Sequence, residues 1–172
     1  NMWKEIMEDI FKDTIKELNI NDYKFELSGS YRRGKLDSGD VDILISTETK
    51  GNIILDKYYD NLIKNKIIIN KNLISKGTTK IMAVTKIDNT FRHLDIFYYP
   101  KEVFPFSLLF TTGSKEFNII MRSHANRKGY SLNEKNLSKL NGQLVTENEY
   151  NFKIGKNIPE NEEDIFLFLD FT

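Results

Sequence analysis

The stretch SGSYRRGKLDSGDVDIL, residues 28–44, places two carboxylates one residue apart inside an apolar run. Residues two apart on a strand project from the same face, so Asp40 and Asp42 are expected to lie side by side. Two like charges at that distance repel, and burying them without a partner is costly. A divalent cation would remove this conflict, and Mg²⁺ prefers hard oxygen ligands of this kind.

A third acid, Asp95, stands inside another apolar run, FRHLDIFYYP at residues 91–100. If its strand lies beside the strand of Asp40 and Asp42, three carboxylates converge, which is enough to hold two cations. The alternative for the acid pair is an exposed edge strand with solvated acids, or residues that cap a neighbouring element. The pattern of acids leaves both interpretations open.

The residues ahead of the acid pair are typical of an anion site. Gly29 and Ser30 can form a tight turn whose backbone N–H groups face an anion, as in nests that bind phosphate. Arg33 can add a fork of donors to phosphate oxygens. A Gly-Ser turn is common by itself, but this one precedes an acid pair. The combination predicts a triphosphate held by the turn and the arginine, with its metal on the acids.

The composition is that of a globular chain. Its 172 residues suffice for one domain or two small lobes, and 40% of them are apolar and 29% charged. The absence of cysteine excludes disulfides and thiolate metal sites. The longest apolar runs, such as IFLFL at 165–169, are too short to span a membrane. The amphipathic amino terminus resembles neither a signal nor a transit peptide.

The charges are unevenly distributed, although the formal net charge is zero. Between Lys50 and Lys101, nine lysines and Arg92 outnumber four aspartates, which leaves a balance of +6. From Glu147 to Thr172 the balance is −5. The basic region is compatible with contacts to a DNA backbone, and equally with a solvated surface.

Periodicity along the chain predicts an α+β protein. Apolar residues at three- and four-residue steps indicate helices over residues 3–18 and 51–65. The expected strands cover 23–30, 40–46, 66–75, 79–87 and 90–99, with a turn at 32–39 and a hairpin at Asp88-Asn89. Beyond Pro105 we expect helices around 107–110, 114–127 and 160–169, and short strands within 128–137 and 142–146. This change of character is the candidate boundary between a mixed sheet and a mostly helical lobe.

The chain resembles the family X DNA polymerases, the polymerase beta-like nucleotidyltransferases. The similarity rests on GSYRRGKLDSGDVDILIS, RHLDIF, FTTGSKEFNIIMRSHANRKGYSLNE and NEEDIFLFL, which occur in the family's order. Many nucleotidyltransferases share the first motif, whereas the Thr-Gly-Ser segment selects the polymerase branch. The resemblance implies a nucleotidyltransferase palm with a mixed or antiparallel sheet over residues 1–105. It also implies a small, mostly helical nucleotide- and template-binding lobe over residues 106–172.

The resemblance implies roles for individual residues. Asp40, Asp42 and Asp95 would be catalytic and bind two Mg²⁺ ions, for which Mn²⁺ can substitute, and Asp95 would help to activate the primer 3′-hydroxyl. The residues expected at the nucleotide are Gly29, Ser30, Arg33, Ser38, Gly39, Phe110, Thr111, Thr112, Gly113, Lys115 and Asn118. The residues expected at the template side are Arg122, and Asn133 and Glu134, which help to position it.

The chain departs from the family pattern at several positions. Phe110-Thr111 replaces a Tyr-Phe pair, so sugar discrimination is expected to differ. His93 and Phe97 replace arginines that in relatives belong to the charge network around the metal acids. We therefore expect the coupling between closing of the enzyme and assembly of the metal site to differ as well. His93 is interpreted either as a residue that supports these acids or as a structural one.

The implied function is a template-dependent DNA polymerase that adds dNTPs to a primer 3′-hydroxyl by two-metal nucleotidyl transfer, in gap filling during DNA repair. The implied partners are gapped or primed DNA and dNTPs, and no membrane is expected. The resemblance also implies a monomer inside the cell, in the host cytoplasm or virion if the protein is viral and otherwise in the nucleus or cytoplasm. Too few residues precede the first motif for an amino-terminal lyase domain, as in a minimal viral-type form. Two alternatives stay open: a nucleotidyltransferase with another acceptor, such as RNA, a protein or a small molecule, and an inactive nucleic-acid-binding module.

Overall fold

A computed structural model of the chain describes residues 2–34, 40–48, 51–87 and 89–171. The chain forms two compact units, residues 1–101 (unit 1) and residues 102–172 (unit 2). The division falls four residues before the expected boundary at residue 105. The expected α+β class is confirmed, because unit 1 carries a mixed sheet and unit 2 is mostly helical.

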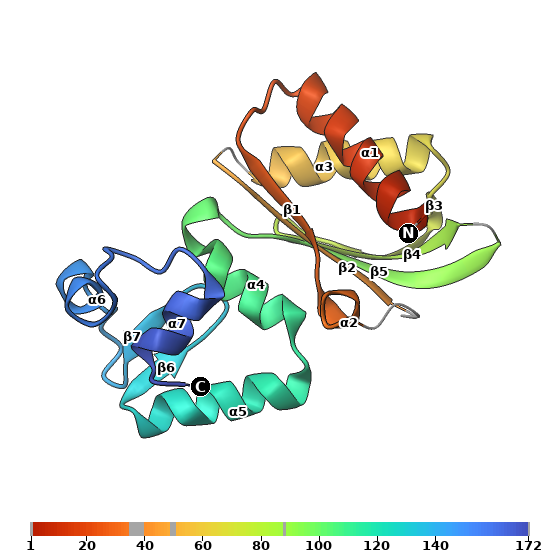
Figure 1. The fold of residues 1–172 in the computed structure, drawn as a ribbon. Helices are drawn as coiled ribbons and strands as arrows, with labels where there is room; N and C mark the ends of the chain where they lie inside the picture. Colours follow the sequence, from red (N-terminus) through yellow and green to blue (C-terminus); the bar gives the residue numbers. More distant parts are fainter. Residues whose placement is uncertain (1, 35–39, 49–50, 88, 172) are drawn as a thin grey trace. The chain divides into compact units, whose positions relative to one another are not determined.

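Unit 1 is built on a five-stranded sheet with the strand order β1-β2-β5-β4-β3 (Figure 1). Strands β2 and β5 run parallel, and the other neighbouring pairs are antiparallel. The described elements of the unit are α1 (Met2–Glu17), β1 (Tyr23–Leu27), α2 (Gly29–Arg32), β2 (Asp40–Thr47), α3 (Gly51–Lys64), β3 (Ile68–Lys76), β4 (Lys80–Ile87) and β5 (Thr90–Tyr98).

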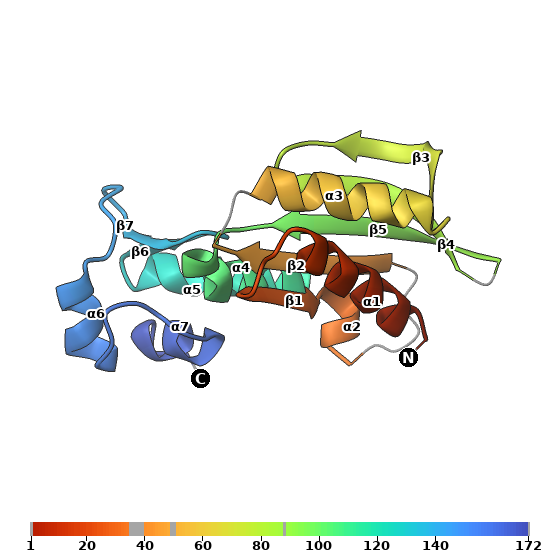
Figure 2. The same cartoon turned by 90° about the horizontal axis from the view of Figure 1, so that it is seen from above.

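Helices α1 and α3 lie on the same side of this sheet and bury its apolar face (Figures 1 and 2). The apolar repeat of α1 leaves Met7 and Phe11 without any exposed surface. The Phe11 ring stacks on Phe25 of β1 with 4.7 Å between centroids, and it meets Tyr58 of α3 edge-on at 5.4 Å. The buried Tyr58 hydroxyl donates to the carbonyl of Met7 at 2.9 Å, so its polar group is satisfied. This packing holds the two helices together above the sheet.

The alternation of side chains along β5 assigns them to the two faces of the sheet. Leu94 and Ile96 are fully buried in the core beneath the helices. Asp95 and Phe97 therefore project from the opposite face, which neither α1 nor α3 covers. The acids expected at the site thus lie on the open side of the sheet.

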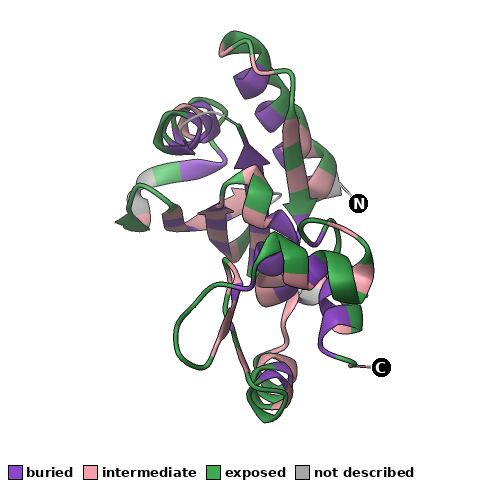
Figure 3. Cartoon of the chain, turned by 90° about the vertical axis from the view of Figure 1, so that its left-hand side faces the viewer, coloured by how far each residue is buried: buried purple, intermediate pink, exposed green. Residues whose placement is uncertain are grey.

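Unit 2 has a hydrophobic core of its own, to which Leu109, Met121, Ile165 and Phe168 belong. Its described elements, which follow the 3₁₀ helix η1 (Lys101–Val103), are α4 (Phe104–Thr112), α5 (Lys115–Arg127), β6 (Tyr130–Leu132), β7 (Leu137–Lys139), α6 (Glu147–Ile154) and α7 (Glu162–Phe168). Figure 3 shows buried and exposed residues in stripes along the helices, as expected for amphipathic elements. Among the described residues, no helix is both long and apolar enough to cross a membrane.

Several local expectations were wrong. The strand expected over 23–30 ends at Leu27, because Gly29 adopts a φ of 62° and the chain turns into the short helix α2. A short strand expected within 128–137 is observed as β6, but the segment then turns back into β7, which was not expected as its partner. In the turn between them the Asn133 side chain accepts the N–H groups of Lys135 and Asn136 at 2.9 Å. The strand expected over 142–146 is only an isolated bridge between Ser138 and Leu144.

Helix α6 was not expected from the sequence. It begins with a capping box, in which the Thr146 hydroxyl accepts the N–H of Glu149 at 3.2 Å and the Glu149 carboxylate accepts the N–H of Thr146 at 3.4 Å. The Thr-x-x-Glu spacing was the available signal. The apolar residues before Thr146 were interpreted as a strand, which obscured it.

Candidate active site

The parallel pairing of β2 with β5 brings the expected acids into one neighbourhood. In this register Asp42 lies opposite Asp95, and Asp40 lies opposite His93. Adjacent strands are about 4.8 Å apart, so the side chains of Asp42 and Asp95 start as close neighbours on one face of the sheet. Asp40 precedes Asp42 by two residues and shares that face.

The charges of these acids act on one another. Asp42 is half-buried, and burial together with the neighbouring charges of Asp95 and Asp40 raises its pKa to about 6. His93 and Arg33 lower it in part. The negative form of Asp42 is therefore disfavoured in the folded chain, and a bound cation would reverse this.

Asp95 carries an acceptor that lacks a partner. Its Oδ1 atom is buried and accepts no hydrogen bond from the described residues, while Nδ1 of His93 lies 3.4 Å away, at ion-pair distance if the imidazole is protonated. Burial raises the pKa of Asp95, and His93 and Lys80 lower it in part. The contact with Asp95 favours the interpretation of His93 as a residue that supports the acid.

The chemistry of these ligands fits Mg²⁺, because they are hard carboxylate oxygens and one of them receives no hydrogen bond from the described part of the chain. Among the residues that the structure describes, however, no three His, Cys, Asp or Glu side chains are gathered closely enough to hold an ion. The three-carboxylate metal site therefore stays a prediction. Its support is the strand register and the raised pKa values of Asp42 and Asp95.

The turn ahead of β2 packs directly against Asp42. The backbone N–H of Ser28 donates to the carbonyl of Asp42 at 2.8 Å, which ties the turn to the acid strand. Gly29 has a φ of 62°, and a Cβ added there would lie 2.1 Å from Oδ2 of Asp42. Both the backbone conformation and the close approach exclude a side chain at residue 29.

Arg33 lowers the pKa of Asp42 in part through its charge. Its backbone N–H donates to the carbonyl of Gly29 at 3.3 Å and ends the short helix α2. Ser38 and Gly39 lie outside the described residues, and the Ser30 side chain is not described either. The role of this turn in triphosphate binding stays a prediction for all five residues.

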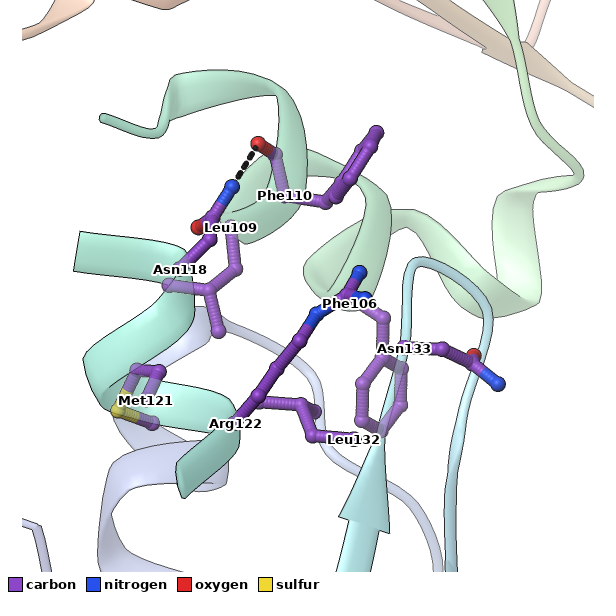
Figure 4. A pocket seen from close by; sticks show the side chains of 8 residues that line it. All are labelled: Phe106, Leu109, Phe110, Asn118, Met121, Arg122, Leu132 and Asn133. Carbon is purple, nitrogen blue, oxygen red and sulfur yellow. Dashed lines mark hydrogen bonds between the residues drawn. The ribbon is translucent and has the colours of Figure 1, made fainter. Parts of the chain in front are cut away.

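In unit 2, the residues expected at the base pair surround Arg122. Its guanidinium lies over the Phe110 ring, 5.6 Å from the centroid, and Nη2 is 3.8 Å from Oε2 of Glu134. The Asn118 side chain donates to the carbonyl of Phe110 at 3.0 Å (Figure 4). The Glu134 carbonyl accepts the buried Ser107 hydroxyl at 2.8 Å, which anchors the turn that carries it.

Figure 4 shows the small pocket around which these side chains lie. Its lining residues are Phe106, Leu109, Phe110, Asn118, Met121, Arg122, Leu132 and Asn133. The pocket has a volume of about 10 Å³, the room of about one water molecule. It cannot take a nucleotide, so we interpret it as the packing that orients Arg122 and Asn118.

The remaining expected nucleotide contacts lie where α4 passes into α5. The Thr111 hydroxyl donates to the carbonyl of Ser107 at 2.9 Å, so α4 already uses it. Thr112 is the last, half-buried residue of this helix, and Gly113 caps it with an N–H bond to the carbonyl of Leu109 at 3.4 Å. Lys115 is exposed in the first turn of α5.

Lys80 is a neighbour of the site that sequence reasoning did not single out. It pairs with Phe97 across β4 and β5, its ammonium lies 5.0 Å from the centroid of that ring, and it lowers the pKa of Asp95. The available signal was the expected hairpin at Asp88-Asn89. Counting back from a two-residue loop pairs Ile87 with Thr90, and hence Lys80 with Phe97.

Comparisons with known proteins match both units. A family model described as DNA polymerase beta palm matches residues 4–101, and one described as DNA polymerase beta thumb matches residues 107–172. A DNA polymerase lambda of Rattus norvegicus is 34% identical over 154 residues, which are 82% of this chain and 26% of the relative. A DNA polymerase lambda of Arabidopsis thaliana is 27% identical over 149 residues, 78% of this chain and 27% of the relative.

A bacterial protein is similar as well. The DNA polymerase/3′-5′ exonuclease PolX of Bacillus subtilis (strain 168) is 30% identical over 111 residues, 64% of this chain and 18% of the relative. The chain thus spans about a quarter, or less, of the length of these curated relatives.

Proposed function

Because the chain belongs to the family X DNA polymerases, we propose that it transfers a nucleotide from a dNTP to a primer 3′-hydroxyl under the direction of a template strand. One observation carries the proposal: Asp42 and Asp95 are opposite each other on parallel strands, and the Gly29 turn packs against Asp42. Acids suited to a cation thus lie beside a turn suited to an anion. A dNTP with its metal requires both.

The acids and the turn have separate tasks in this proposal. Polymerases of this family depend in general on a divalent metal, and two Mg²⁺ ions would neutralise charge on the reacting phosphate and on the leaving pyrophosphate. Asp40, Asp42 and Asp95 are the proposed ligands, and Mn²⁺ is expected to substitute. Oδ1 of Asp95 is buried without a hydrogen-bond donor among the described residues, so a cation bound there would supply the partner that it lacks. The proposed triphosphate contacts are Gly29, Ser30, Arg33, Ser38 and Gly39.

The residues of unit 2 are proposed to act on the incoming nucleotide and the template. Phe110 and Glu134 hold the Arg122 side chain from two sides, which limits its rotamers before any ligand binds. Asn118 is tethered to the carbonyl of Phe110 and can turn its amide towards a base edge. The other proposed contacts are Thr111, Thr112, Gly113 and Lys115 at the nucleotide and Asn133 beside Arg122.

The test is extension across a one-nucleotide gap with each of the four template bases in turn. We expect Mg²⁺-dependent insertion of the complementary nucleotide, which would also agree with gap filling in repair. Asp95→Asn should abolish insertion, and Asp60→Asn, an exposed acid of α3, should leave it unchanged. Undiminished insertion by folded Asp95→Asn would refute the assignment of Asp95.

The same assay separates the alternatives. Pyrophosphate release with RNA, a protein or a small molecule as acceptor, and none with gapped DNA, would indicate a nucleotidyltransferase with another acceptor. No pyrophosphate release with any acceptor would indicate an inactive nucleic-acid-binding module. For the turn, Arg33→Ala should raise the dNTP concentration needed for half-maximal insertion, and an unchanged dependence would count against its role.

A further inference from the structure

The ribbon of β4 and β5 presents a second row of side chains beside the acids. Residues directly opposite each other in an antiparallel pair share a face. The pairs that share the face of Asp95 are Lys80 with Phe97, Met82 with Asp95, Val84 with His93, and Lys86 with Phe91. This row lies on the side of the sheet that α1 and α3 leave open.

Phe91 is the unusual member of this row. Its side chain is 60% exposed, and it belongs to neither hydrophobic core. The Lys86 ammonium lies 5.4 Å from the centroid of its ring. Burial of Phe91 therefore stabilises the fold little, while an aromatic face and a positive charge are presented together at the surface.

The position of Phe91 relative to the acids is set by a single strand. Phe91 and Asp95 are four residues apart on β5 and point to the same side, which separates them by about 13 Å along the strand. The described part of β2 begins opposite His93, so the ribbon continues beyond it towards the hairpin. An extended ligand, such as a nucleic-acid strand, whose end reaches Asp95 can therefore pass over His93 and then over Phe91.

The chemistry of the pair matches a nucleic-acid strand. The bases of a paired primer are stacked inside the duplex, so its sugars are the apolar groups that an aromatic ring can reach irrespective of sequence. Lysine attracts the phosphates between these sugars. On β4 this face carries Lys80 and Lys86 and no acid, while on β5 it carries Asp95, four residues beyond Phe91. The charge next to Phe91 is therefore the ammonium of Lys86, which favours a phosphate.

We propose that Phe91 and Lys86 form a contact site for the primer strand, upstream of the 3′ end that reacts at Asp95. The proposal rests on the proposed polymerase function for the position of the primer end. The ring packs against a sugar of the primer, and the ammonium of Lys86 neutralises a neighbouring phosphate. The site is independent of template sequence, so it contributes affinity for primed DNA and not base selection.

Binding of a labelled duplex with a recessed 3′ end tests the proposal, with the full chain, Mg²⁺ and no dNTP. Phe91→Ala should weaken binding about threefold to tenfold, the loss expected when one apolar contact to a sugar is removed. Phe91→Trp should retain the affinity of the parent chain. Ile53→Ala, which removes an apolar side chain that is 51% exposed from α3, is the matched control and should not change affinity.

Two further measurements define the partner. Lys86→Gln should reduce the slope of log affinity against log salt concentration by about one, the change expected when one phosphate contact is lost. Phe91→Ala should leave the slope unchanged. The parent chain, and not Phe91→Ala, should protect the sugars of the primer strand from hydroxyl-radical cleavage. The same response from the template strand alone would overturn the assignment to the primer.

The outcomes separate this proposal from the proposed function. Equal affinity of Phe91→Ala and the parent chain, or no binding of primed DNA by the parent chain, overturns the contact site. Weaker binding by Phe91→Ala without any nucleotide insertion by the parent chain would support the contact and refute the polymerase. Nucleotide insertion by the parent chain, together with an unaltered affinity of Phe91→Ala for primed DNA, would support the polymerase and refute the contact site.

Discussion

Asp42 of β2 lies opposite Asp95 of β5 in a parallel strand pair, and burial and the charge of Asp95 raise the pKa of Asp42 to about 6. A fold selected for stability alone would not place two partly buried acids at this position. The arrangement is unfavourable without a counter-ion and becomes favourable with one. The following predictions depend on this relationship and on its surroundings.

Removing the charge of Asp42 should stabilise the chain at neutral pH when no divalent metal is present. The pKa of Asp42 is raised from 3.8 to about 6 by folding, so the folded state is penalised as the acid ionises. The penalty is absent below about pH 4 and complete above about pH 6 to 7. With allowance for solvent screening of a partly exposed group, Asp42→Asn should gain about 1–2 kcal/mol at pH 7.

Urea unfolding of both chains from pH 4 to pH 8 measures this difference. The gain of Asp42→Asn should fall to a small remainder at pH 4, because Asp42 is then protonated in the folded chain and partly protonated in the unfolded one. A constant difference across the whole range would show that the substitution acts through packing and not through charge.

Mg²⁺ should stabilise the parent chain against unfolding. A cation that binds the folded state and not the unfolded one raises stability by about 1.4 kcal/mol for each tenfold excess over its dissociation constant. Asp42→Asn should lose most of this response, and Asp60→Asn should keep it, because that residue lies on α3. Thermal unfolding during a Mg²⁺ titration measures the effect, and an equal response of all three chains would contradict the metal site.

Gly29→Ala should disturb the site as well as the fold. Residue 29 has a φ of 62°, and the new Cβ would lie 2.1 Å from Oδ2 of Asp42. Gly34→Ala is the matched control, since Gly34 also has a positive φ, 88°, but nothing lies within 4 Å of the added Cβ. We expect Gly34→Ala to cost about 1 kcal/mol of stability through the backbone alone.

Gly29→Ala should cost more than its control, by about 1–3 kcal/mol, because Asp42 or the turn must shift. It should also weaken the Mg²⁺ response, which Gly34→Ala should not. Equal behaviour of the two variants in unfolding and in Mg²⁺ titration would show that the contact between the turn and Asp42 has no part in the site.

Glu134→Gln should change nucleotide insertion more than stability. The ion pair with Arg122 is 3.8 Å long and partly exposed, and such pairs contribute about 1 kcal/mol or less. The turn itself is held through the backbone, by the Ser107 hydroxyl on the carbonyl of Glu134. Loss of the charge should therefore release Arg122 without unfolding the turn.

Ser107→Ala provides the contrasting control, because it removes the buried hydroxyl and should lower the melting temperature. Single-turnover insertion and thermal unfolding of both variants distinguish the two effects. Normal insertion by Glu134→Gln would refute a positioning role for the ion pair.

Several elements of unit 1 could be predicted from local patterns. The helix expected over 3–18 is observed as α1, and the strand expected over 40–46 is observed as β2. The strand expected over residues 23–30 runs through Gly29, where the observed strand has already ended. An alternation of apolar and polar residues predicts a strand but does not reveal a positive φ. Helix α6 was missed for a related reason, since the cap formed by Thr146 and Glu149 is a polar signal next to an apolar segment.

The sequence by itself determined that Asp40 and Asp42 share a face, because the two-residue repeat of a strand is a local property of the backbone. Only the tertiary structure decided that Asp95 faces Asp42 and that Phe91 follows Asp95 beyond the end of β2. Parallel strands have no hairpin to set their register, so it depends on how the apolar residues of β2 and β5 pack beneath α1 and α3. Those contacts join residues some fifty positions apart, and no local pattern in either strand contains them.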